Sequence, residues 1–146
     1  SATAAELAAL SGPALRLGDD RQVEAQARVY VLPAQGKVVS GFHELNTTGY
    51  RERGVRLSVE PEARIVAPAA GKVSFAGRYR SYGQIVIIEH GNGWNSLVTH
   101  MGSVKVTKGE AVRQGALLGS ADKEASEIGV ELRKNGRVMD IAALLR

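Results

Sequence analysis

Short runs of β-branched and aliphatic residues, separated by turn-forming residues, dominate the chain from residue 28 onward. The runs at 29–32, 37–39, 55–59, 64–66, 72–75, 84–89, 96–100 and 104–106 are typical of strands, because proline, glycine or asparagine bounds them. The run 85–88 has no polar alternation, so we expect it to be buried on both faces at the centre of a sheet. Asn-Gly pairs at 92–93 and 135–136 predict two tight hairpins.

The first residues follow a different pattern. Residues 2–10 are alanine-rich, with Leu7 and Leu10 three positions apart, and the Ser-Gly-Pro sequence at 11–13 ends the predicted helix. Because such a short helix is only marginally stable in water, it must pack against another part of the protein or belong to a longer upstream element. We expect three parts: a helical stub (1–12), a polar linker (13–27) and one β-domain (28–146). Residues 140–145 are expected to form a short helix or a turn.

Composition narrows the class of protein. The chain has 146 residues, 17 glycines and a net charge of +4, which fits one turn-rich domain with its own core. The absence of cysteine excludes disulfides and thiol chemistry. The sequence has neither an aromatic-basic platform nor a recognition helix, the features that would indicate nucleic acid binding. It also has no apolar stretch long enough to span a membrane. The positive charge fits either an anionic partner or a solvated surface.

The strongest signal is a succession of short motifs at the ends of the predicted strands. The motifs are Gly54-Val55, Ala67-Pro68, Gly71-Lys72-Val73, Tyr82-Gly83, Glu89-His90-Gly91-Asn92-Gly93, Thr99-His100-Met101, Gly109-Glu110-Ala111-Val112 and Val130-Glu131-Leu132-Arg133. This succession resembles the LytM (lysostaphin-type) family of peptidoglycan endopeptidases over residues 33–145. The resemblance implies an all-β fold, a β-sandwich or barrel-sandwich hybrid, here with a short N-terminal helix.

The same resemblance assigns the positions of the family's zinc ligands. Glu52 stands at the first histidine, Arg56 at the aspartate and Gly129 at the last histidine, with Glu127 at the partner of that histidine. Glycine has no donor atom, and arginine has N–H groups but no lone pair to give a metal. We therefore expect no metal, no cofactor and no peptidase activity, which describes a pseudo-metallopeptidase.

A vacated active-site groove is then the candidate binding site. Arg56 is expected to point into it, either pairing with Glu52 or Glu127 or contacting a partner directly. His100 is expected to remain as a groove wall, His90 to satisfy backbone groups, and Trp94 either to contact a partner or to fold onto the core. The predicted groove residues are Arg51, Glu52, Arg56, Arg78, Tyr79, Tyr82, His100, Glu127 and Arg133.

The resemblance is closest to the branch of EnvC-type activators, which have lost zinc and activate other cell-wall hydrolases; the loop 121–127 departs from the family pattern. It implies that the groove binds the regulatory helix of a zinc-dependent N-acetylmuramoyl-L-alanine amidase in a Gram-negative periplasm, with a coiled-coil region upstream in the same protein. A passive peptidoglycan-binding module is the main alternative. A second alternative is a histidine phosphocarrier, in which His100 and His90 would be the paired histidines.

Overall fold

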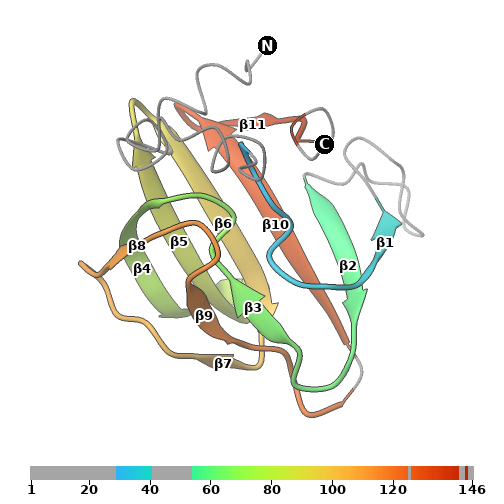
Figure 1. Ribbon diagram of the computed structural model, residues 1–146. Coiled ribbons are helices and arrows are strands. Elements are labelled where there is room, and N and C mark those ends of the chain that lie inside the picture. Colours follow the sequence, from blue (N-terminus) through green and yellow to red (C-terminus); the bar gives the residue numbers. More distant parts are fainter. Residues whose placement is uncertain (1–28, 41–53, 125, 142–143, 145–146) are drawn as a thin grey trace, which may run out of the picture.

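The computed structural model describes residues 29–40, 54–124, 126–141 and 144, and all its strands belong to two antiparallel sheets (Figure 1). Helical conformation within these residues is confined to the 3-10 turn η1 (Arg80–Tyr82) and to Leu144, whose N–H donates to the Ile141 carbonyl at 2.9 Å. The expected all-β fold is confirmed. The predicted helix at 2–10 and the linker at 13–27 lie outside the described residues.

The large sheet has the strand order β1-β2-β10-β6-β5-β4-β8, with β11 paired to β10. Its hairpins β5–β6 and β10–β11 turn at the two Asn-Gly pairs, where Asn92 and Asn135 have φ of 53° and 51°. Positive φ at both central residues is what a tight hairpin requires, so both turn predictions are confirmed. The strands are β1 (Lys37–Ser40), β2 (Val55–Val59), β4 (Gly71–Arg78), β5 (Gln84–Gly91), β6 (Trp94–Met101), β8 (Ala111–Val112), β10 (Ser126–Lys134) and β11 (Arg137–Met139).

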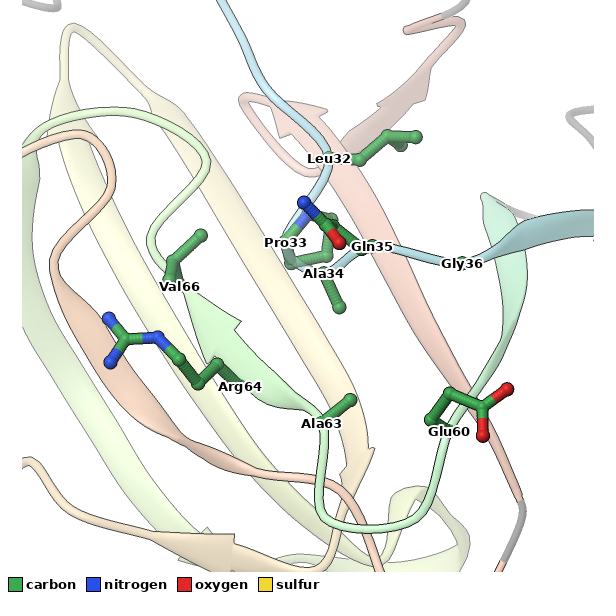
Figure 2. Close-up of a pocket in the computed structure, with 9 residues that line it drawn as sticks. All are labelled: Leu32, Pro33, Ala34, Gln35, Gly36, Glu60, Ala63, Arg64 and Val66. Carbon is green, nitrogen blue, oxygen red and sulfur yellow. The ribbon is translucent and has the colours of Figure 1, made fainter.

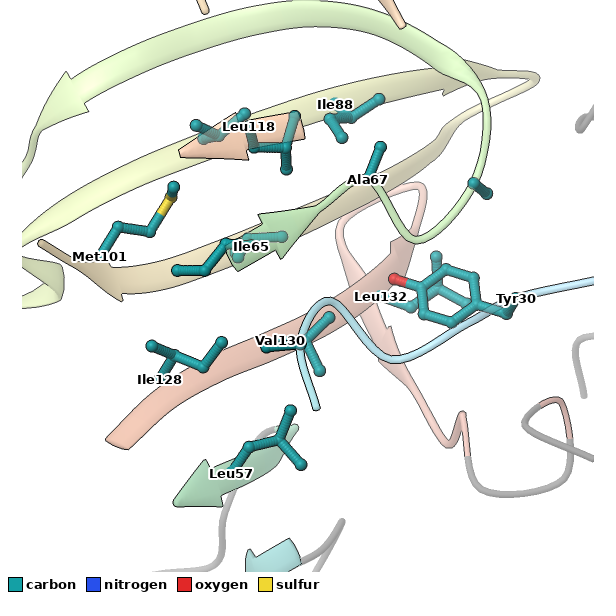
Figure 3. Close-up of a cluster of buried hydrophobic side chains, with 14 of the residues drawn as sticks. Tyr30, Leu57, Ile65, Ala67, Ile88, Met101, Leu118, Ile128, Val130 and Leu132 are labelled. Atoms are coloured by element: carbon teal, nitrogen blue, oxygen red, sulfur yellow. The ribbon is translucent and has the colours of Figure 1, made fainter. Parts of the chain in front are cut away.

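The small sheet has the order β3-β9-β7 and lies in front of the large sheet in Figure 1. Its strands are β3 (Arg64–Val66), β7 (Ser103–Val104) and β9 (Leu117–Ser120). The core fills the space between the two sheets (Figure 3). Ile65 and Leu118 meet Leu57, Val130 and Leu132 there, and all five are 0–1% exposed. The hydrophobic effect of this burial is what holds the two sheets together.

The run 85–88 lies on β5, which has a neighbour on each side. Ile85, Val86 and Ile88 are at most 1% exposed, as expected, whereas Ile87 is half-buried. Val86 and Ile88 belong to the main core, but Ile85 does not, because alternation turns it to the other face of the sheet. The outer face of the sheet therefore has apolar cover of its own at this end.

The segment 29–32 does not form the strand that its sequence predicts. It runs extended beside the end of β3, with one bond from Val31 N–H to the Pro68 carbonyl (3.0 Å) and one from Val66 N–H to the Pro33 carbonyl (2.7 Å). Proline has no N–H, so Pro33 and Pro68 each remove a donor from the pairing. The apolar run is still buried in part, and Tyr30 is fully enclosed by the core.

Alternation along β2 and β10 decides what lies on the outer face of the large sheet. On β2, Val55, Leu57 and Val59 are buried, and Arg56 between them is turned outward, as predicted. On β10, Ile128, Val130 and Leu132 face the core, which leaves Glu127, Gly129, Glu131 and Arg133 outward.

Candidate partner-binding groove

The outer faces of β2, β10 and β6 form the floor of a groove. Gly129 is paired with Arg56 on one side and with Thr99 on the other, so three neighbouring strands bring these residues into one row. The loop that contains η1 supplies a wall. We call this pocket of about 300 Å³ the outer groove, and it is lined by Gly54, Val55, Arg56, Ser81, Tyr82, Thr99, His100, Gly129, Val130 and Glu131.

Arg56 and Glu127 form an ion pair at one side of the outer groove. The distance from Arg56 Nη1 to Glu127 Oε1 is 3.3 Å, and both side chains are 41% exposed. Of the two expected partners of Arg56, Glu127 is therefore the one seen in the structure, while Glu52 and Arg51 lie outside the described residues. At this exposure the pair contributes at most about 1 kcal/mol to stability.

Thr99 occupies the space in front of Gly129. A Cβ added at Gly129 would lie 2.6 Å from Thr99 Oγ1, so even an alanine would displace the threonine. The same oxygen lies 3.0 Å from His100 Nδ1. The sequence analysis did not identify Thr99 as a groove residue. Its position next to His100, on the same face of β6 as Leu97, is the signal that could have done so.

His100 has a backbone conformation that is unusual within a strand. Its φ is 60°, in the left-handed region, and the side chain is exposed. This conformation breaks the alternation of β6, so that Thr99 and His100 line the same groove although they are adjacent in sequence. Residues held in such conformations concentrate at functional sites, because the surrounding structure must hold them in place.

Arg133 and Glu131 form a second ion pair on the outer face of β10. Arg133 Nη2 and Nε donate to Glu131 Oε1 at 2.9 and 3.2 Å. Partial burial lowers the pKa of the Arg133 guanidinium, but its interactions with Glu131 and then with Tyr82 outweigh this and raise the pKa above its usual value. Glu131, only 9% exposed, was missed as a site residue, although its position two residues before Arg133 places both on one face of the strand.

Aromatic and basic side chains form the rim of the outer groove. The rings of Tyr79 and Tyr82 are stacked with centroids 6.3 Å apart, and Phe75 meets Tyr79 edge-on at 5.8 Å. The Arg80 guanidinium lies 5.3 Å from the centre of the Tyr79 ring. Tyr82 lines the groove, whereas Tyr79 is 42% exposed on the rim and Arg78 is exposed at the end of β4.

These side chains do not fit a zinc ion. Within the described residues no three histidine, aspartate or glutamate side chains lie close enough to hold a metal. The chemistry of the donors agrees: Arg56 has no lone pair to give, Gly129 has no side chain, and Glu131 accepts two hydrogen bonds from Arg133. The described part of the groove suits hydrogen bonding and ion pairing with a ligand.

Two other sequence candidates lie in the core instead. Trp94 is 1% exposed, so the folded-over alternative is correct, and the Lys134 ammonium lies 4.8 Å from its ring centre. His90 is 7% exposed, and each of its ring nitrogens makes a hydrogen bond, as expected of a structural histidine.

The contacts of His90 form a directional chain. Nδ1 lies 2.6 Å from the Ala70 carbonyl, which can only accept, so Nδ1 carries the proton and Nε2 accepts from Ser96 Oγ at 2.7 Å. Ser96 Oγ in turn accepts from the Tyr30 hydroxyl at 2.6 Å. Burial lowers the pKa of His90 and outweighs the hydrogen bond to the Ala70 carbonyl, which alone would raise it. Burial raises the pKa of the Tyr30 hydroxyl. Both groups are therefore held neutral.

Comparison with known proteins gives the class to which this fold and groove belong. The model of peptidase family M23 matches residues 50–141, which include most of the strands of the large sheet and the whole small sheet. The chain belongs to peptidase family M23.

Individual relatives are distant. The chain is 27% identical to the cell division protein DipM of Caulobacter vibrioides over 62% of this chain and 15% of DipM. It is 28% identical to the murein hydrolase activator NlpD of Escherichia coli over 72% of this chain and 28% of NlpD. The structure of Helicobacter pylori Csd3 superposes with a TM-score of 0.70 at 21% identity, over 80% of this chain and 34% of Csd3. At that identity the Csd3 likeness shows the fold.

The match to each of these proteins is partial. The chain spans less than a third of the length of DipM and NlpD, so it corresponds to one region of them. Within the described residues, no helix has the length and apolar content needed to cross a bilayer. The names of these relatives refer to cell division for DipM and to the activation of murein hydrolases for NlpD.

Proposed function

We propose that this domain has no peptidase activity and activates a periplasmic N-acetylmuramoyl-L-alanine amidase during cell division. The outer groove binds the regulatory helix of the amidase and draws it away from the amidase active site. One observation carries the proposal: Arg56, Gly129 and Thr99 form one row on the floor of the outer groove of this M23 domain, and neither the Arg56 guanidinium nor Gly129 can give a lone pair to zinc.

The shape and chemistry of the outer groove support a helix as the ligand. Its floor is buried apart from the partly exposed Arg56, and its rim carries exposed Tyr79, Arg78 and Arg80, which suit an amphipathic helix with acidic residues beside its apolar face. Activation requires only that the groove bind the displaced helix, because that binding shifts the amidase toward its open state. The likeness to NlpD, a murein hydrolase activator, supports this kind of partner.

The central experiment is release of dye from labelled peptidoglycan by the domain alone, by a zinc amidase from the same source alone, and by the mixture. The proposal expects release to rise in the mixture only, with no release by the domain alone. Release by the domain alone would refute the absence of catalysis. A mixture no faster than the amidase alone, at saturating domain, would refute activation.

A matched pair of variants locates the contact. Arg56→Glu should weaken activation at least tenfold in domain concentration, a free energy of about 1.4 kcal/mol. Lys108→Glu is the control, since this exposed residue lies in the turn just before β8, at the opposite end of the strand order from β2. Equal effects of the two variants would point to net charge in place of a groove contact.

A passive peptidoglycan-binding module is the second candidate. It is favoured by the exposed Arg78, Tyr79 and Arg80 on the rim, which could bind the carboxylates of stem peptides without any protein partner. Sedimentation with purified sacculi tests it: co-sedimentation that salt weakens, together with no amidase activation, would favour this module.

A further inference from the structure

A second groove lies beside the small sheet (Figure 2). It runs between the segment 32–36 and β3, and we call it the entry groove because the chain enters the domain there. Its volume is about 870 Å³. Leu32, Ala34, Ala63 and Val66 give it an apolar lining, with Arg64 and Glu60 at its edges.

The walls of the entry groove are held in place. The two bonds Val31 N–H to Pro68 and Val66 N–H to Pro33 fix the segment 31–33 to β3. The buried hydrogen bond from Tyr30 to Ser96 anchors the same segment to the large sheet. The groove is therefore preformed, and an occupant would not have to pay the free energy of shaping it.

We propose that the predicted helix at residues 2–10 of this chain docks in the entry groove. The predicted helix has Leu7 and Leu10 on one face, with Thr3 one turn before Leu7 on the same face, and is too short to be stable without a packing partner. The apolar lining of the entry groove is open to solvent, so burying the two leucines against it would stabilise both surfaces.

Charge supports the pairing. Glu6 lies one turn before Leu10 and so borders the face that carries the two leucines, while exposed Arg64 borders the apolar lining of the groove. A carboxylate and a guanidinium at matching edges favour one orientation of the helix in the groove.

The connection is long enough for the chain to return. Residues 11–28 link the helix to Val29, and at about 3.3 Å per residue they span up to about 60 Å. The helix itself is about 14 Å long at 1.5 Å per residue. A tether of this kind holds the helix near the groove at an effective concentration on the order of millimolar, so even weak docking is populated.

Docking there has a consequence for the outer groove. The upstream region would be held on the small-sheet side of the domain, and the outer groove would stay open to a partner.

Disulfide trapping tests the docking directly, because the chain has no cysteine of its own. Thr3→Cys keeps both leucines, and it is paired in separate variants with Gln35→Cys or Glu60→Cys, exposed positions at the entry groove. We expect one of these pairs to close within a single chain under mild oxidation. The control pairs Thr3→Cys with Ser81→Cys, on the wall of the outer groove, and should stay open.

Three outcomes would overturn the proposal: closure of the Ser81 pair, crosslinks between two chains only, or no crosslink with either entry-groove position. The first would place the helix in the outer groove, and the second would indicate a second copy as the occupant. Peptide mapping of the oxidised protein distinguishes these results.

A stability measurement on the full chain gives a second, independent test. Leu10→Glu should lower Tm by about 3 °C and prevent the crosslink, since a charge would replace an apolar contact. Ala5→Glu is the control, because position 5 lies on the opposite face of the helix, and it should change neither. Unchanged Tm and crosslinking in Leu10→Glu would also contradict docking.

Discussion

The two histidines of the β5–β6 hairpin lie in opposite environments. His90 is buried on the inner side of the large sheet, where its ring nitrogens bond to the Ala70 carbonyl and to Ser96. His100 is exposed in the outer groove, in a left-handed backbone conformation, beside an ion pair open to solvent. The inner side contributes to stability, and we propose that the outer side serves binding, so substitutions on the two sides should affect different measurements.

The largest expected effect comes from the buried aromatic of the core. Trp94→Ala should lower the free energy of unfolding by about 3–5 kcal/mol, because it leaves a large cavity. Tyr79→Ala, on the groove rim, should lower it by less than about 1 kcal/mol and weaken amidase activation instead. Urea denaturation measures both, and similar losses for the two variants would break the comparison.

The buried hydrogen-bond chain should give the next effect. Ser96→Ala leaves His90 Nε2 without its donor and the Tyr30 hydroxyl without its acceptor. Each unsatisfied buried group costs about 1–3 kcal/mol, so we expect a loss of roughly 3 kcal/mol in the free energy of unfolding. His100→Ala should change it by no more than about 0.5 kcal/mol. A loss that small in Ser96→Ala would mean that water replaces the missing partner.

The outer groove can be tested through the close approach of Gly129 and Thr99. Gly129→Ala forces its Cβ against Thr99 Oγ1, which should cost about 1–3 kcal/mol. In a Thr99→Ala background the same change should cost clearly less, because the obstructing atom is gone. Equal costs in the two backgrounds, measured as a double-mutant cycle, would show that the strain lies elsewhere.

The pH dependence of stability should separate the two histidines. Because burial lowers the pKa of His90 in the folded state, the unfolded chain binds the proton more readily. The contribution of His90 is fully present above about pH 6.5 and is lost as the pH falls below that value toward the folded pKa. Unfolding free energies between pH 7.5 and 5.5 should therefore fall in the native chain and in His100→Gln, but less steeply in His90→Gln. The same slope in all three proteins would contradict this assignment.

Only a small stability effect is expected at the Arg56–Glu127 pair. Arg56→Ala should cost at most about 1 kcal/mol, since both partners are 41% exposed. The same variant should weaken activation of the amidase in the dye-release assay, in contrast to the core variants, whose folded fraction should activate normally. A large loss of stability without any change in activation would reverse the roles given to the two sides of the sheet.

Much of the fold follows from local sequence. The strands at 37–39, 55–59 and 64–66 lie where the short apolar runs predict them, and both Asn-Gly pairs form hairpin turns. The run 29–32 is the exception, because Pro33 and Pro68, one on each side of the pairing, have no N–H to donate. Strand propensity describes a single segment and does not take into account whether the neighbouring segment has N–H groups to donate.

The candidate site was predictable in part. Alternation along β2 was enough to turn Arg56 outward, and the spacing of Glu127 and Gly129 put them on one face of β10. Sequence left the partner of Arg56 open and did not identify Thr99 or Glu131, because those assignments depend on which strands are neighbours.

The sequence by itself determined the all-β class, the hairpin turns and the residue types at the outer groove, since these depend on periodicity, turn geometry and side-chain chemistry. Only the tertiary structure decided that Arg56, Gly129 and Thr99 form one row and that Trp94 folds inward. It also decided that Tyr30, Ser96 and His90 form one buried chain. The physical reason is that strand order and register join residues far apart in the sequence, and these long-range pairings depend on burying the whole core at once.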